Sequence, residues 1–192
     1  TPTAAASLEF VSSSAVDAVN QAGAREFTFT GLDANWVEQT VVVAAHATNG
    51  TTAVAIPGTW MRLYRWYVSK SGSYATSIVG SHTGTLTVRV AGGGATWSTI
   101  GVTPFALGQS EIGVYTIPLG KTAWVLSKRV NVEGTKPADI YFFQRPFAND
   151  VSASYTGTMR LVEHDVGVVG PLVGDFATSG SSFVGPCDIG FL

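Results

Sequence analysis

Apolar and polar residues alternate with a period of two along most of the chain, which is the pattern of β-strands with one buried face. Between residues 24 and 31, for example, Phe27 and Phe29 alternate with glutamate and threonine. Similar runs, alternating or rich in β-branched and aromatic residues, lie at 36–45, 60–69, 86–90, 112–117, 123–132, 140–143 and 159–166. No stretch of ten residues has helical periodicity. The pattern predicts an all-β fold built as an antiparallel sandwich or barrel, with a jelly-roll-like β-sandwich preferred.

Glycines separate most of these runs, and the chain has 22 of them. Glycine adopts positive φ without steric cost, so it suits the tight reversals between antiparallel strands. The stretches 71–85 and 91–95 are predicted to be exposed connections, where binding specificity often lies. Two Pro-Gly segments, 56–60 and 117–124, each precede a Trp-bearing strand. Two similar hairpin halves would explain this likeness, and so would convergent turn chemistry.

The chain is poor in charge. Of its 192 residues, 12% are Asp, Glu, Lys or Arg and 45% are hydrophobic, whereas an ordinary globular chain carries about 25% charged residues. This length and apolar content predict a single β-sandwich domain over 1–192 with a sizeable core. The formal net charge is −2 and no run of Lys or Arg occurs. The sequence therefore argues against a direct nucleic-acid partner, because it offers no basic surface for phosphates.

The mean hydropathy of +0.25 raises the question of a membrane span. The uncharged interval 39–61 is long enough to cross a bilayer, but His46, the turn at 48–51 and the Pro57-Gly58 pair interrupt it. A soluble protein with no membrane partner is therefore predicted. The first six residues lack the basic and apolar regions of a signal peptide, so an export signal would have to precede Thr1.

The sequence contains few candidates for catalysis or metal binding. The three histidines, at positions 46, 82 and 164, do not have the spacing of common metal motifs. Glu163 and Asp165 would share one strand face, but two carboxylates are a poor cage for a cation. The Gly-x-Ser-x-Gly turn of a nucleophilic serine is absent, and Asp188 opposes thiolate formation at Cys187, the single cysteine. We therefore expect no enzyme, no catalytic residues, no metal and no cofactor.

Neighbouring aromatic residues indicate a packing surface. Side chains alternate along a strand, so Trp66 and Tyr67 face opposite sides, and so do Phe142 and Phe143. Aromatics on both faces favour assembly with other copies or another protein, although core packing would also explain each one. The predicted interface residues are four aromatics and two arginines that could pair with acids across a boundary: Trp66, Tyr67, Phe142, Phe143, Arg62 and Arg65.

Five further segments form a recurrent pattern: SSSAVD at 12–17, GAR at 23–25, GLDANW at 31–36, NGTTAV at 49–54 and GQSEIGVYTIPLGKTA at 108–123. These segments resemble a family of virion structural proteins of aquatic tailed bacteriophages. The resemblance implies a capsid decoration, or cement, protein: a β-sandwich, typically trimeric, seated where major capsid subunits meet. It implies the partners, which are further copies of the chain and the major capsid protein. It also implies a location on the capsid surface after synthesis in the host cytoplasm, and it transfers no catalytic residues.

Two other functions fit the sequence. A tail or fibre module that binds a host-surface glycan would use some of the five tryptophans as stacking platforms, beside loops of small residues. That function predicts an exposed aromatic pair in a groove. A hydrolase of the sandwich class would require acids or His164 to converge in one cleft.

Overall fold

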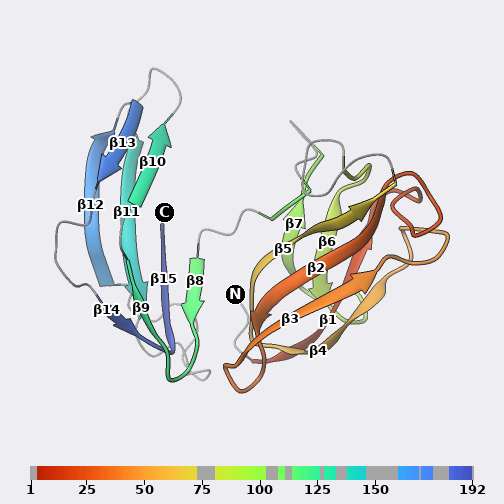
Figure 1. Ribbon diagram of the computed structural model, residues 1–192, viewed down its shortest axis with the longest axis horizontal. Helices are drawn as coiled ribbons and strands as arrows, with labels where there is room; N and C mark the ends of the chain where they lie inside the picture. The colour runs from red at the N-terminus through yellow and green to blue at the C-terminus, as the bar shows by residue number, and fades with distance from the viewer. Residues whose placement is uncertain are drawn as a thin grey trace. The chain divides into compact units, whose positions relative to one another are not determined.

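The computed structural model describes residues 4–72, 81–102, 108–110, 114–125, 128–132, 138–145, 160–168, 170–174 and 182–191. Every regular element within these ranges is a β-strand (Figure 1). All strand pairs in the described residues are antiparallel. The all-β, antiparallel prediction is therefore confirmed. The period-two pattern explains this fold, since it lets each strand bury one face.

The chain divides into two compact units, Thr1–Ile112 and Gly113–Leu192. The sequence favours one domain over 1–192, and that domain number stays a prediction.

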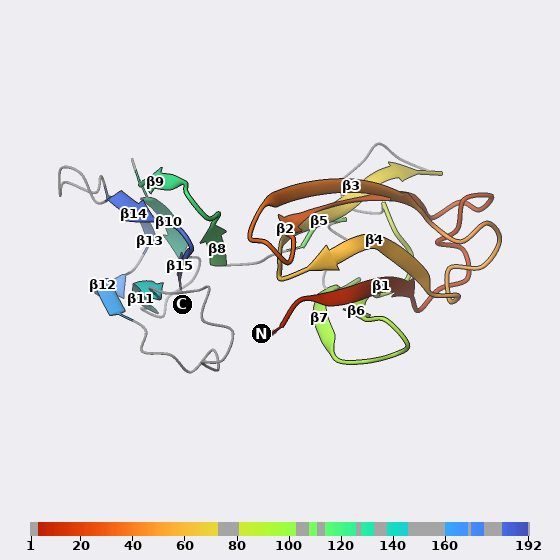
Figure 2. The same ribbon diagram turned by 90° about the horizontal axis from the view of Figure 1, so that it is seen from below.

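Unit 1 contains two sheets. One has the strand order β4-β1-β6-β7 and the other has the order β3-β2-β5. Figure 2 shows the second sheet lying over the first. The strands are β1 (Ala6–Ser12), β2 (Ala24–Leu32), β3 (Glu38–Ala44), β4 (Val54–Trp60), β5 (Arg62–Ser71), β6 (Leu86–Val90) and β7 (Thr96–Ile100).

Aromatic side chains from both sheets fill the core of unit 1. The rings of Phe10 in β1 and Phe27 in β2 lie 4.7 Å apart between centroids. Trp66 in β5 stacks on Phe29, with centroids 5.7 Å apart and planes 11° apart. Its indole Nε1 donates a hydrogen bond of 2.9 Å to Ser98 Oγ on β7, in the facing sheet. Shared burial of apolar area and this cross-sheet bond hold the sandwich together.

A buried carboxylate ties the loops at one end of unit 1. Asp17 lies in the connection between β1 and β2 and accepts hydrogen bonds from Ser12 Oγ and from the N–H groups of Ala24, Thr83 and Gly84. A buried charge is tolerated when its oxygens are fully hydrogen-bonded. Asp17 therefore positions the residues that lead into β6.

Unit 2 contains a four-stranded sheet of order β12-β11-β15-β8 and two-stranded sheets β10-β13 and β14-β9. Ile117, Phe142, Phe183 and Cys187 form a buried cluster in it. The strands are β8 (Val114–Ile117), β9 (Thr122–Trp124), β10 (Lys128–Val132), β11 (Ala138–Arg145), β12 (Arg160–Val168), β13 (Gly170–Gly174), β14 (Ser182–Val184) and β15 (Cys187–Phe191).

The two Pro-Gly segments do not occupy equivalent positions. Pro57 and Gly58 lie within β4, whereas Pro118 and Gly120 lie in the turn between β8 and β9. The strands β4 and β5 belong to different sheets, and so do β8 and β9, so neither segment forms a hairpin. The local likeness therefore occurs in two different settings, the interior of a strand and a turn between strands.

Candidate interaction surface

The six predicted interface residues have different surroundings. Trp66 is fully buried in unit 1 and Phe142 is buried in unit 2. Phe142 packs edge-on against Phe183, with centroids 6.0 Å apart and planes 80° apart. The side chain of Phe143 lies outside the described residues. Burial within a unit makes Trp66 and Phe142 part of its core, which is the alternative that the sequence left open.

Arg62 is also buried, beside Trp36. Its guanidinium carbon lies 4.9 Å from the centroid of the Trp36 ring, and its Nη1 donates to the Met61 carbonyl at 2.9 Å. The Trp36 ring and the Met61 carbonyl stabilise the buried Arg62 guanidinium at the junction between β4 and β5. The side chain of Arg62 therefore serves packing within unit 1.

Arg65 and Tyr67 differ from Trp66, Phe142 and Arg62, because they lie on the outer face of β5. They alternate with Trp66 and Val68, whose side chains are buried in the core. The Arg65 guanidinium lies 4.7 Å from the centroid of the Tyr67 ring. Its Nη2 donates to Gln109 Oε1 at 3.3 Å. A ring below and an amide beside it restrict the orientations that this arginine samples.

Backbone bonds hold Gln109 next to β5. Val68 N–H donates to the Gly108 carbonyl at 2.7 Å, and Ser110 N–H donates to the Trp66 carbonyl at 2.9 Å. Ser110 Oγ accepts from Trp66 N–H at 3.0 Å. The segment 108–110 therefore pairs with β5 through the bridge between Tyr67 and Gln109. No local sequence pattern predicts this pairing, because it joins residues far apart along the chain.

The neighbours of Arg65 and Tyr67 on this face are small. Thr30 lies opposite Arg65 and Thr28 lies opposite Tyr67 in the β2–β5 pairing. On the far side of β2, Thr30 pairs with Thr40 and Thr28 with Val42. Val42 is 59% exposed. We call this surface the Arg65 face; its residues are Thr30, Thr40, Val42, Arg65 and Tyr67, together with the buried Thr28.

The adjoining part of this sheet carries a paired acid, Glu26, and an exposed acid, Glu38, on the same face of β3 as Thr40. Glu26 accepts from Ser69 Oγ at 3.1 Å and lies 3.7 Å from Lys70 Nζ. Among the residues that the structure describes, no carboxylate lies within ion-pair distance of Arg65. The Arg65 face therefore combines an exposed, oriented cation with an exposed apolar side chain.

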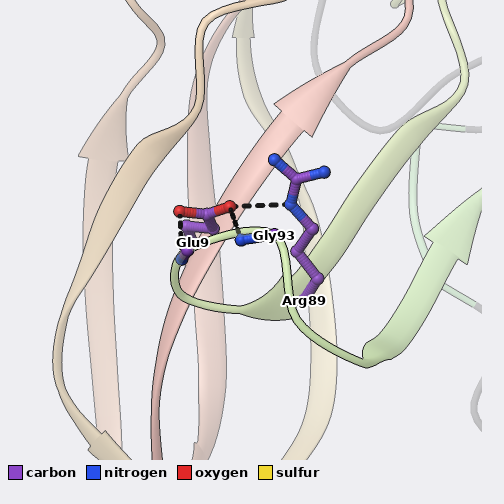
Figure 3. Close-up of polar contacts among 4 residues, drawn as sticks. Glu9, Arg89 and Gly93 are labelled. Atoms are coloured by element: carbon purple, nitrogen blue, oxygen red, sulfur yellow. Dashed lines mark hydrogen bonds and ion pairs between the residues drawn. The ribbon is translucent and has the colours of Figure 1, made fainter.

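The other sheet of unit 1 carries an ion pair that is already satisfied (Figure 3). Arg89 Nε donates to Glu9 Oε1 at 2.7 Å. The N–H groups of Gly92 and Gly93 donate to the same carboxylate at 3.0 and 3.1 Å. The Gly92 N–H bond, followed by the Arg89 and Gly93 bonds, lowers the pKa of Glu9 despite its partial burial. This group closes the β6–β7 turn, where both glycines have positive φ, and so it stabilises the fold.

Unit 2 exposes apolar side chains on the β9–β14 pair. Trp124 is 61% exposed and Val184 is 67% exposed. Trp124 lies opposite Ser182, and Thr122 lies opposite Val184. Trp36, Trp60 and Trp66 are buried, and Trp97 packs against the core of unit 1. Of the five tryptophans, Trp124 is therefore the one that is mostly exposed.

The remaining chemistry gives no cluster within the described ranges. No group of three or more His, Cys, Asp or Glu side chains there could hold a metal ion. His82 is buried and its Nδ1 lies 2.8 Å from the Gly84 carbonyl, while Glu163 and Asp165 have side chains outside the described residues. No helix in the described part of the chain is long and apolar enough to cross a membrane.

No protein-family model, curated protein or solved structure matches this chain.

Proposed function

We propose that this chain is a non-enzymatic structural protein of a tailed-bacteriophage virion. In this proposal it decorates the capsid, bridges major capsid subunits and acts as a homo-oligomer, with a trimer favoured. The resemblance of segments such as 12–17 and 108–123 to virion structural proteins supports the proposal. The fold is compatible with it, because an antiparallel sheet can bury one face and present the other to a partner.

The observation that carries the proposal is the Arg65 face. It joins an exposed Val42, a half-buried Tyr67 and an oriented Arg65 on one side of the β3–β2–β5 sheet. Apolar and aromatic side chains with arginine are the composition that protein interfaces favour. The small threonines between them leave few long side chains to be ordered on binding.

A bridging protein of this kind stabilises a shell by mass action. A ligand that binds the assembled shell and not its separate subunits shifts the equilibrium toward assembly. Contacts from several copies in one oligomer add through effective concentration. The function therefore requires a surface, and no single side chain has to perform chemistry.

Two measurements on one sample test this function. Light scattering gives the solution mass of the full-length protein, and cosedimentation with capsids stripped of decoration measures binding to the shell. We expect an oligomer, a trimer in the favoured case, that pellets with the capsids. A protein that stays in the supernatant at micromolar concentration would contradict the decoration function.

The second candidate function is a tail or fibre module that binds a host glycan. The exposed Trp124, with the hydroxyl groups of Thr122 and Ser182 on the same β9–β14 pair, favours it. A glycan screen with the wild type and Trp124→Ala tests this function. Sugar binding that the variant loses would support it, and the absence of any bound glycan would count against it.

A further inference from the structure

We infer that the Arg65 face is the surface that binds the capsid shell, and that Arg65 pairs there with an acidic side chain of the shell protein. This inference rests on the proposed function. It adds to that function the contact face and the chemistry of the partner.

The Arg65 guanidinium is held in one orientation before any carboxylate binds. The Tyr67 ring at 4.7 Å supports one side of the guanidinium. The Arg65 Nη2 group donates a hydrogen bond to Gln109 Oε1 at 3.3 Å. Backbone bonds between the segment 108–110 and β5 hold Gln109 in place. Since part of the ordering of the side chain occurs on folding, less conformational entropy is lost on binding.

The charge of Arg65 is complementary to a carboxylate on a partner. Two other described cations form ion pairs within the chain: Arg89 pairs with Glu9, and Lys70 pairs with Glu26. Arg65 is exposed, and no acid of the described chain lies within ion-pair distance of it. Arginine binds a carboxylate through two parallel N–H bonds, which are among the stronger hydrogen bonds in proteins. The group that complements this face is therefore an anion with planar oxygens.

The position of Arg65 on the outer face of a β-sheet favours an acidic protein side chain over an acidic sugar as its partner. On this sheet, Val42 of β3 lies opposite Thr28 of β2 and is 59% exposed. An apolar side chain beside an arginine is typical of protein contacts, whereas small ligands bind in concave sites lined by several convergent polar groups. The arrangement favours a carboxylate that is carried by a protein surface.

Binding isotherms of the full-length protein on stripped capsids test the inference. We expect Arg65→Ala to weaken binding by roughly tenfold, the loss typical of a truncated interface arginine. Arg65→Lys keeps the charge but loses the two-pronged geometry, so its binding should fall between those of the wild type and Arg65→Ala. Lys121→Ala is the matched control, because it removes an exposed positive charge from unit 2. The control should bind within about twofold of the wild type.

A pair of valine variants tests the face without touching Arg65. Val42→Asp places a negative charge on the Arg65 face, where it repels an acidic partner, so binding should weaken by about tenfold or more. Val184→Asp makes the same change at a comparably exposed strand position in unit 2 and should bind as the wild type does. Thermal unfolding of each variant confirms that the fold is retained.

The outcomes separate the two proposals. If the wild type pellets and both Arg65→Ala and Val42→Asp bind as tightly as it does, the face is wrong and the decoration function stands. If the wild type itself does not pellet, the function fails and the face assignment fails with it. If Arg65→Ala changes the solution mass instead of shell affinity, the face joins copies of this chain, and the inference is overturned. Capture of an acidic glycan through Arg65 would overturn it as well.

Discussion

The Gly84 N–H donates a hydrogen bond of 2.7 Å to Asp17 Oδ2, although the two residues are 67 positions apart in the sequence. Asp17 Oδ2 also accepts from Ser12 Oγ at 2.6 Å. Its Oδ1 accepts from the N–H groups of Ala24 and Thr83 at 3.0 and 2.9 Å. One buried carboxylate thus joins the end of β1, the start of β2 and the approach to β6.

This arrangement predicts that Asp17→Asn destabilises the protein by roughly 2–4 kcal/mol, because an amide NH₂ would face N–H donors inside the fold. Chemical denaturation of the full-length chain measures the loss. The matched control is Asp33→Asn, since Asp33 also accepts two backbone N–H bonds but in an exposed turn. The control should cost under about 1 kcal/mol. Equal losses in the two variants would contradict the role assigned to Asp17.

The Glu9 group predicts a pH dependence of stability. The pKa of Glu9 in the folded protein lies below its ordinary value of 4.5, chiefly because of the Gly92 N–H bond. A lowered folded pKa stabilises the protein fully above the unfolded pKa, and this contribution is lost as the pH falls through the folded pKa. Glu9→Gln should therefore cost about 1 kcal/mol at pH 7 and progressively less below pH 4.5. Denaturation curves from pH 7 to pH 3 measure the difference, and two parallel profiles would show that the Glu9 charge contributes nothing.

The bond between Trp66 Nε1 and Ser98 Oγ predicts a measurable coupling between the two sheets of unit 1. Trp66→Phe and Ser98→Ala each remove one partner of this 2.9 Å bond. A double-mutant cycle on unfolding free energy should give a coupling of about 1 kcal/mol, because the lone partner left in either single variant is poorly solvated. Strictly additive losses would mean that the bond does not contribute to stability.

The exposure of Trp124 predicts a difference among the tryptophans. Trp124 is 61% exposed, whereas Trp36, Trp60 and Trp66 are buried. Iodide should quench the fluorescence of Trp124 most strongly, so Trp124→Phe should remove the most accessible fraction of the signal. An unquenched Trp124 would contradict its exposure to solvent.

The same variant should change the free energy of unfolding by less than about 0.5 kcal/mol, while Phe142→Ala in the core of unit 2 should cost roughly 3–5 kcal/mol.

Local alternation predicted much of unit 1. Phe27 and Phe29 are buried, and Thr28 and Thr30 lie on the other face of β2, as the period of two requires. Trp66 and Tyr67 likewise take opposite faces of β5. These assignments need no tertiary information, because successive side chains of a strand point to opposite sides.

Two features of the same kind could have been predicted but were not. Arg62 and Arg65 are separated by three positions, which places them on opposite faces of a strand, and Arg62 is indeed buried while Arg65 is exposed. Leu8 and Phe10 alternate within β1 and are both buried in the core, yet this short run was not among the strands predicted from the pattern. In each case the period of two along the strand is sufficient to assign the faces.

By itself the sequence determined the all-β class and the face that many side chains take, since both follow from the period of the chain and from its turn residues. Only the tertiary structure decided which strands pair, that Gln109 orients Arg65, and that Asp17 binds Thr83 and Gly84. All of these contacts join residues distant along the chain. The bonds to Asp17 and the pairing that places Gln109 beside β5 use backbone groups that nearly every residue carries, so no local pattern encodes them. The candidate interaction surface therefore required the fold, although its two central residues, Arg65 and Tyr67, could be named from the sequence.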